Sequence, residues 1–287
     1  MSELHRIQTL FEVELNKGMD FLGPKTPLSQ ACEYALQSGG KRVRPLIVIL
    51  VQEALGKYFF PEGALSVEFF HTASLIADDL PCMDNDDQRR NHPSLHRVVG
   101  ETTALLASYA LISSAYEMIA RASSYINAEV GMIALKFAAE CAGICGATGG
   151  QYSDLFEKRR DWEAIKWVIE QKTITLFEVA FGFGWLFGGG DPSRLDEVRK
   201  VAYHFGMAFQ IGDDLSDFQH DCTQENPMNA AICLGEKKAL ELCLEEIKRL
   251  KIGLKALKLE TKGFEELLQK LQALAILTPK SSTQSHL

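Results

Sequence analysis

The amino-acid sequence predicts an all-α protein built as one large helical bundle. Apolar residues recur with helical spacing over most of the chain, and alternating strand patterns are almost absent. In addition, 46% of the 287 residues are hydrophobic, which is enough for a sizeable core. Because no linker, repeat or shift in composition divides the chain, we expect a single domain over residues 1–278 and a disordered tail over 279–287.

The expected helices follow one another along the chain, each ended by glycine, proline or a polar cluster. Gly23-Pro24 ends the first helix, Ser38-Gly39-Gly40 ends the second, and a polar group at Gly149–Leu155 interrupts a later one. The helices are expected at residues 3–20, 28–38, 46–54, 62–80, 101–122, 127–147, 161–187, 193–220, 235–250 and 261–277.

Charge and composition exclude several classes of protein. A net charge of −8 argues against nucleic acid as the main partner. No run reaches the roughly 18 uninterrupted apolar residues of a membrane span, so we do not expect an integral membrane protein. The first residues lack the pattern of a secretory signal, and seven cysteines in apolar surroundings indicate buried thiols in a reducing compartment. We therefore expect a cytoplasmic protein.

The first candidate site is an acidic cluster at the end of an apolar helix. The apolar run 71–77 leads into Asp78, Asp79 and Asp84, and Arg89 and Arg90 follow closely. Unpaired carboxylates at the end of a buried helix need a cation, and Mg²⁺ binds one or two carboxylates together with phosphate oxygens. On a straight helix Asp78 and Asp84 would lie about 120° apart, so Pro81 is expected to introduce a kink that brings them together.

A second acidic cluster, Asp213-Asp214-x2-Asp217, ends another apolar run. Asp213 and Asp217 lie one turn apart on one helix face, where like charges repel unless a cation binds between them. Either cluster alone could be a solvated acidic surface, but two of them at the ends of apolar helices favour metal binding. The candidate metal ligands are therefore Asp78, Asp79, Asp84, Asp213, Asp214 and Asp217.

Several cations accompany these clusters. Lys41 and Arg44 follow a glycine pair, where cations oppose the dipole of the next helix unless an anion binds between them. His71 lies two turns before Asp78, although a lone histidine on an apolar helix is more often a core residue. Lys172, followed by Thr173, could equally be a surface residue. Two metal sites and scattered cations together predict a diphosphate held by several Mg²⁺ ions.

These motifs, in this order, resemble a known family. The residues concerned are Gly39-Gly40-Lys41-Arg42-Val43-Arg44-Pro45, His71, Asp78-Asp79-x4-Asp84 with Arg89-Arg90, Gly149-Gly150-Gln151 with Asp154-Leu155, Lys172-Thr173, and Phe209-Gln210-Ile211-Gly212-Asp213-Asp214-x2-Asp217. The pattern covers about residues 28–220 and is similar to that of the trans-isoprenyl diphosphate synthases, the farnesyl and geranylgeranyl diphosphate synthase group. The Pro81-Cys82 insertion resembles the short-chain bacterial and plant type.

The resemblance implies an isoprenoid synthase fold with a central apolar cavity and a prenyltransferase reaction. An allylic diphosphate ionises with the help of Mg²⁺, about three ions per active site, and isopentenyl diphosphate attacks the carbocation. The resemblance implies catalytic roles for Asp78, Asp79, Asp84, Lys172, Gln210 and Asp213. It also implies substrate binding by Lys41, Arg44, His71, Arg89, Arg90, Lys172, Thr173 and Gln210, and a homodimer.

Product length is expected to depend on the residues one and two turns before the first acidic cluster. Ala73 and Ser74 are small where farnesyl-producing relatives usually carry an aromatic ring, and Phe70 lies one turn further down. The resemblance therefore favours a twenty-carbon product, geranylgeranyl diphosphate, over fifteen-carbon farnesyl diphosphate.

The chain departs from the family pattern at three places. Ala77 replaces a histidine, Ser108-Tyr109 replaces Gly-Asp, and residues 224–231 lack the lysine of a Gly-Lys-Asp loop. Two further functions remain open: a terpene cyclase or hydrolase, which generally lacks the Gly-Gly-Lys-Arg-x-Arg segment, and a non-catalytic synthase subunit, which usually loses one acidic motif.

Overall fold

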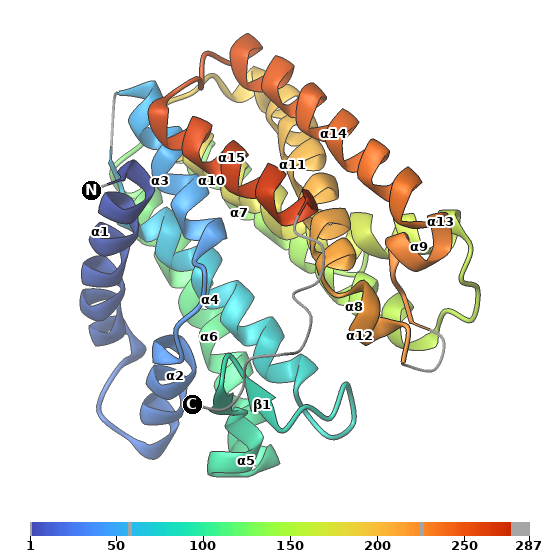
Figure 1. The fold of residues 1–287 in the computed structure, drawn as a ribbon. Helices are drawn as coiled ribbons and strands as arrows, with labels where there is room; N and C mark the ends of the chain where they lie inside the picture. Colours follow the sequence, from blue (N-terminus) through green and yellow to red (C-terminus); the bar gives the residue numbers. More distant parts are fainter. Residues whose placement is uncertain (1, 57–58, 224–226, 277–287) are drawn as a thin grey trace. The chain divides into compact units, whose positions relative to one another are not determined.

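The computed structural model describes residues 2–56, 59–223 and 227–276. Over these residues the protein is all-α, as the sequence predicts, with one two-stranded hairpin (Figure 1). The α-helices are α1 (Glu3–Gly18), α2 (Pro27–Gln37), α3 (Val43–Leu55), α4 (Pro61–Asp78), α5 (Leu95–Val99), α6 (Glu101–Ser123), α7 (Ala128–Ala142), α8 (Ala147–Phe156), α9 (Trp162–Val168), α10 (Thr175–Phe187), α11 (Leu195–Ser216), α12 (Phe218–Asp221), α13 (Ala230–Leu234), α14 (Glu236–Ala256) and α15 (Lys262–Ile276).

The chain folds as two compact units. The first comprises Met1–Ala142 with Val179–Leu195, and the second comprises Gly143–Glu178 with Asp196–Leu287. Helix α10 begins in the second unit and ends in the first. The expectation of one domain over residues 1–278 stays a prediction, and the tail expected at 279–287 lies outside the described residues.

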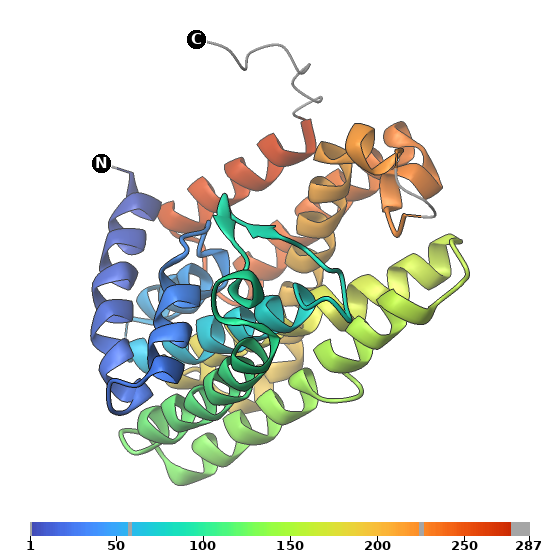
Figure 2. The ribbon, with the colours of Figure 1, turned by 90° about the horizontal axis from the view of Figure 1, so that it is seen from below.

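The first unit is built around α4, which lies among α1, α2, α3 and α6 (Figure 2). Most of α4 is apolar and buried, as expected of a helix that is covered on several sides. The Ser108 hydroxyl of α6 donates a 3.0 Å hydrogen bond to the carbonyl of Ala73 and so joins α6 to the centre of α4. Ser108 is one of the residues at which the sequence departs from the family pattern.

The second unit is organised around α11. The Cys243 thiol of α14 donates to the Ala208 carbonyl of α11 at 3.3 Å, and the His204 ring contacts the buried Glu246 carboxylate at 2.6 Å. A Cβ on Gly212 would lie 3.3 Å from Leu274 of α15, so the glycine allows α15 to approach α11 closely. These contacts hold α11, and with it the second acidic cluster, against two further helices.

The largest difference from the expected helices lies between residues 127 and 187. The helix expected at 127–147 ends at Ala142, and the polar group at 149–155 is itself helical, as α8. The helix expected at 161–187 contains a π-helical turn, η2 (Ile169–Ile174), between α9 and α10. The helix expected at 193–220 is divided into α11 and α12, and sequence periodicity missed α5 and α13, because helices this short complete hardly more than one turn.

Two helical stretches meet the length and composition criteria for a membrane span: Glu101–Ser123, and Ala128–Phe156, which comprises α7 and α8. In the most apolar part of each, 39% and 33% of the residues are buried inside the structure. Core helices of soluble proteins meet the same criteria, so the expectation that the protein does not span a membrane stays a prediction.

Candidate active site

The first acidic cluster lies at the C-terminal end of α4, where the helix stops and the chain turns back. Helix α4 ends at Asp78, whereas the sequence predicted a kinked helix through residue 80. Pro81 cannot donate a helical hydrogen bond, and the chain instead folds so that the amide of Asp84 donates to the carbonyl of Asp78 at 2.9 Å. The backbones of Asp78 and Asp84 are thus adjacent, which a continuous helix would not achieve.

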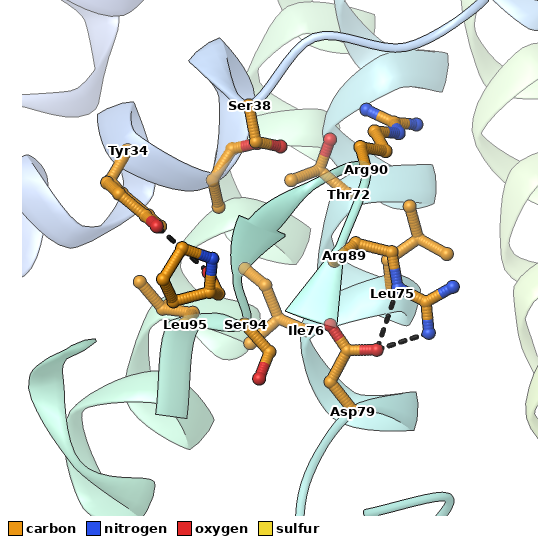
Figure 3. A pocket seen from close by; sticks show the side chains of 12 residues that line it. Tyr34, Ser38, Thr72, Leu75, Ile76, Asp79, Arg89, Arg90, Ser94 and Leu95 are labelled. Carbon is orange, nitrogen blue, oxygen red and sulfur yellow. Dashed lines mark hydrogen bonds and ion pairs between the residues drawn. The ribbon is translucent and has the colours of Figure 1, made fainter. Parts of the chain in front are cut away.

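Asp79 points away from this turn and binds Arg89. Its side chain is only 4% exposed, and Arg89 Nε donates to Asp79 Oδ1 at 2.8 Å (Figure 3). Burial raises the pKa of Asp79, and the Arg89 guanidinium opposes that rise. The geometry therefore favours Asp79 as the residue that orients Arg89, and its role as a metal ligand stays a prediction.

Arg89 and Arg90 lie on a short antiparallel hairpin, β1 (Gln88–Arg89) and β2 (His92–Pro93). The two connecting residues, Arg90 and Asn91, have φ values of 56° and 64°, as in the type I′ turns that match strand twist. Arg90 extends away from Asp79 (Figure 3) and its guanidinium donates to the carbonyl of Gly39. The adjacent residues Arg89 and Arg90 therefore bind two different parts of the first unit, Asp79 and the Gly39 carbonyl.

The glycine pair before α3 makes room for Arg90. Gly40 has φ +122°, and a Cβ at this position would overlap the guanidinium of Arg90. Lys41 follows on the surface, while Arg44 in the first turn of α3 is half-buried. The predicted diphosphate-binding cations Lys41, Arg44 and Arg90 therefore lie around one loop.

His71 belongs to the same group of cations. Arg44 Nη1 lies 3.3 Å from His71 Nε2, and because a guanidinium can only donate, Nε2 accepts and the ring proton is on Nδ1. Burial, reinforced by the charges of Arg44, Arg90, Arg42 and Arg89, holds the pKa of His71 well below its usual range. His71 is therefore a neutral ring among arginines, rather than the isolated core histidine that was the alternative.

The second unit holds the Lys172-Thr173 segment in the π-helical turn η2. A Cβ on Gly150 of α8 would collide with the backbone of Gln171 and Lys172, so only glycine allows this approach. The Lys172 ammonium forms an ion pair with Asp154, one turn further along α8. A π-helical turn is rare and often marks a functional site.

A chain of hydrogen bonds links η2 to the second acidic cluster. The Thr173 hydroxyl donates to Gln210 Oε1 at 2.9 Å, and Gln210 Nε2 donates to Asp214 Oδ1 at 2.9 Å. The Ala230 amide of α13 donates to Asp214 Oδ2 at 2.8 Å. Burial raises the pKa of Asp214 to about 7, although the bonds from Ala230 and Gln210 oppose the rise. Asp214 therefore joins α11 to α13.

Asp213 and Asp217 lie one helical turn apart, as the spacing predicted, with the amide of Asp217 donating to the Asp213 carbonyl at 3.0 Å. The Asn229 amide donates to the Asp214 carbonyl and to Asp221 Oδ2, both at 2.9 Å. Asn229 and Ala230, within the segment 224–231 that lacks the lysine of the family pattern, thus brace this cluster, whereas residues 224–226 lie outside the described residues.

The candidate chain-length residues differ in their surroundings. Ala73 is 1% exposed and packs beside Ser108, whereas Ser74 is half-buried and donates to the His71 carbonyl at 2.9 Å. The Phe70 ring meets Tyr116 of α6 edge to face, with 5.1 Å between centroids. Phe70 is therefore backed by a second aromatic ring that the sequence alone did not single out.

The site residues fall into two groups, one in each unit. The first unit holds Lys41, Phe70, Arg44, His71, Ala73, Ser74, Asp78, Asp79, Asp84, Arg89 and Arg90, and the second holds Lys172, Thr173, Gln210, Asp213, Asp214 and Asp217. Within the described part of the chain, no three His, Cys, Asp or Glu side chains are grouped so that they could hold a metal ion. The metal and substrate roles of these residues stay predictions.

Sequence reasoning missed Glu68, a carboxylate on α4 that is buried against the Lys41–Arg44 loop. A charged residue in the otherwise apolar run 63–70 was the available signal, because such a residue is rarely buried without a partner.

Comparison with known proteins identifies the family. A family model described as polyprenyl synthetase matches residues 25–229, so the chain belongs to the polyprenyl synthetase family. It is 39% identical over 214 residues to geranylgeranyl pyrophosphate synthase 3 of Arabidopsis thaliana, an alignment that covers 71% of this chain and 59% of that protein. It is 35% identical over 246 residues to farnesyl diphosphate synthase of Bacillus subtilis, covering 79% and 83% of the two chains.

The fold agrees with this assignment. A solved structure of a geranyltransferase from Legionella pneumophila matches with a TM-score of 0.86 at 26% identity, covering 96% of this chain and 97% of that one. The isoprenoid synthase fold expected from the sequence motifs is thereby confirmed. The chain spans about 60% of the length of the Arabidopsis relative.

The neutral state of the half-buried His71 ring has a consequence for stability. Its pKa is lowered in the folded protein, so on acidification the unfolded chain takes up a proton at this residue before the folded protein does. The free energy of unfolding should therefore fall more steeply for the native protein than for His71→Gln between about pH 7.5 and about pH 5.5. Urea denaturation at the two pH values measures this difference, and equal pH slopes would contradict a neutral His71.

Proposed function

We propose that the protein is a Mg²⁺-dependent short-chain trans-prenyl diphosphate synthase that condenses isopentenyl diphosphate with an allylic diphosphate (dimethylallyl, geranyl or farnesyl diphosphate). The main support is in the first unit, where the guanidinium groups of Arg44 and Arg90 and the neutral ring of His71 lie around the Gly39-Gly40 loop. Such a group of fixed donors suits a diphosphate, which guanidinium groups bind bidentately. A terpene cyclase has no isopentenyl diphosphate to bind there.

The carboxylates fit Mg²⁺ by their chemistry. Asp78 and Asp84 are brought together by the turn after α4, and Asp213 and Asp217 by one turn of α11. Mg²⁺ usually takes one or two carboxylates and completes its shell with phosphate oxygens and water, so each pair could contribute to a diphosphate complex, with about three ions in all. Bound there, Mg²⁺ would neutralise the negative charge that develops on the leaving diphosphate.

The remaining residues would bind and orient the substrates. In the first unit, Arg89, held by Asp79, would contact an allylic diphosphate. In the second unit, Lys172, held by Asp154, carries the same kind of charge for a phosphate oxygen. Gln210 is oriented by Thr173 and Asp214, so its amide is fixed before substrate arrives. This arrangement would stabilise the departing diphosphate, which would then take the proton lost from the condensed product.

The product we propose is geranylgeranyl diphosphate. The small side chains of Ala73 and Ser74 leave no aromatic stopper one turn before Asp78, and the Arabidopsis relative carries this activity in its name. Farnesyl diphosphate is the second candidate, supported by the Bacillus relative and by the paired rings of Phe70 and Tyr116.

Substitution of Asp78 tests the proposed reaction. Asp78→Ala should lower the rate of product formation from isopentenyl diphosphate, an allylic primer and Mg²⁺ by at least about 10³-fold, because the leaving group loses its neutralising metal. The melting temperature should change little. Asp87→Ala, which removes an exposed carboxylate that pairs with Arg97, serves as the matched control and should keep normal rates. If the native protein forms no elongated product, the proposal is wrong.

Substitution of Ser74 tests the product length. Ser74→Phe places a ring where the half-buried serine now lies, and should shift most of the product from twenty to fifteen carbons. Ala73 is less suitable, since overpacking this buried position would cost about 1–3 kcal/mol of stability. Radiolabelled products separated by chain length give the readout, and an unchanged product distribution would remove Ser74 from the cavity floor.

We further propose that the protein is a cytoplasmic homodimer. Helices α6 and α7 pack against each other, and each carries exposed apolar side chains. On α6 these are Leu105, Leu106, Tyr109 and Ile112, and on α7 they are Met132 and Leu135, with exposures between 37% and 63%. An apolar face of this kind is typical of a protein interface.

The homodimer proposal predicts that Leu106→Glu, which buries a charge in the interface, weakens dimerisation by at least about tenfold. Val13→Glu on α1 is a matched control, because Val13 is 48% exposed and Leu106 is 47% exposed. Sedimentation equilibrium measures both variants. A monomeric native protein, or a dimer that Leu106→Glu leaves intact, would contradict the proposal.

A further inference from the structure

Glu68 is a fully buried carboxylate that no proposed step of the reaction uses. It lies in the middle of α4, and its side chain is 1% exposed. A buried carboxylate is costly unless it is paired, and the partner of Glu68 is Arg42, whose side chain is also 1% exposed. Burial raises the pKa of Glu68, whereas the charges of Arg42, Arg90 and Arg44 lower it. The carboxylate therefore lies among the cations of the proposed diphosphate site without facing solvent.

Arg42 connects Glu68 to the loop that carries Lys41 and Arg44. Its Nη1 donates to Glu68, its Nε donates to Glu12 of α1 at 2.9 Å, and its Nη2 donates to the Leu36 carbonyl at the end of α2 at 2.6 Å. One guanidinium thus joins α1, α2 and α4, because its Nε, Nη1 and Nη2 groups each donate to a different helix. It cannot contact substrate at the same time, because almost none of it is exposed.

The backbone of Arg42 is itself in an unfavourable conformation. Arg42 has φ 50°, in the left-handed region that a residue with a long side chain rarely adopts. It precedes the first residue of α3, so its conformation sets the directions in which Lys41 and Arg44 leave the backbone. The bonds to Glu68, Glu12 and Leu36 offset the cost of this conformation.

We propose that Glu68 is a positioning residue for isopentenyl diphosphate, acting through Arg42 to hold Lys41 and Arg44 in their binding geometry. This inference rests on the proposed function, since it assumes that isopentenyl diphosphate binds at this loop. In this role, the negatively charged Glu68 assists the binding of a negatively charged substrate.

Because Glu68 and the substrate are both negatively charged, a positioning role and a direct charge effect predict opposite results when Glu68 is replaced. If Glu68 acted only as a nearby charge, removing it would make the site more positive and would tighten diphosphate binding. If Glu68 acts by positioning, removing its charge leaves Arg42 with a weaker anchor, the left-handed residue relaxes, and binding weakens. The two effects move the KM for isopentenyl diphosphate in opposite directions.

The first variant is Glu68→Gln, which keeps the size of the side chain. The KM for isopentenyl diphosphate should rise about tenfold, while kcat and the KM for the allylic diphosphate change by less than about twofold. An unchanged or lowered KM for isopentenyl diphosphate would overturn the inference. Failure of the native protein to form product would instead overturn the proposed function, so the two failures are distinguishable.

A double variant separates positioning from charge balance and from stability. Arg42→Met with Glu68→Leu removes both buried charges, and such apolar replacement of a buried pair commonly preserves folding. Its melting temperature should equal or exceed that of Glu68→Gln, while its KM for isopentenyl diphosphate stays about tenfold above the native value. Recovery of the native KM would mean that only charge balance matters, and would overturn the inference.

Glu246→Gln is the matched control for loss of a buried carboxylate. Glu246 has a side chain 5% exposed and pairs with His204 and Arg249 in the second unit. The variant should lower the melting temperature without a selective change in either KM. A selective rise in the KM for isopentenyl diphosphate in this control would show that general destabilisation produces the effect, and would count against Glu68.

Discussion

The polar stripe along α4 is the feature on which the first unit depends. Glu68 and His71 lie one turn apart on a mostly buried helix, and Asp79 directly follows its last residue. Each of these side chains contacts a different arginine: Arg42, Arg44 and Arg89, respectively. Two loops distant in the sequence, around residues 39–44 and 86–93, are thereby fixed to a single helix. Their placement follows from the need to pair polar groups that α4 buries.

In the second unit, the buried carboxylate of Asp214 is satisfied by hydrogen bonds from amide groups. Asp214 is buried beside two exposed or half-exposed carboxylates, and the amides of Gln210 and Ala230 satisfy its two oxygens. Because Gln210 is in turn bound by Thr173, the π-helical turn and the acidic end of α11 form one network. Gly150 of α8 lies directly against η2, where a Cβ would collide with the backbone of Gln171 and Lys172.

Sequence periodicity predicted the class of fold and most long helices, because burial of an apolar stripe is a local property of the chain. It could not predict the π-helical turn, which α8 approaches closely at Gly150, or the left-handed backbone of Arg42, which the bonds to Glu68, Glu12 and Leu36 accompany. Sequence periodicity also could not predict which of two adjacent acidic residues binds a given partner. Asp78 and Asp79 point about 100° apart on the helix, and only packing decides which of them meets Arg89. The motif order identified the family, whereas the supporting residues Glu68 and Asn229, and the pairing of Asp154 with Lys172, required the structure.

The left-handed conformation of Arg42 and Arg90 bears on any attempt to engineer this protein for stability. A left-handed residue with a side chain costs roughly 1–2 kcal/mol, and glycine or asparagine would relieve that strain. Replacing Arg90 would relieve this strain but would remove the guanidinium that donates to the Gly39 carbonyl. Replacing Arg42 would leave the buried carboxylate of Glu68 without its partner, which costs about 3–5 kcal/mol and outweighs the strain relieved. Thermostabilised variants of this protein should be sought at other positions.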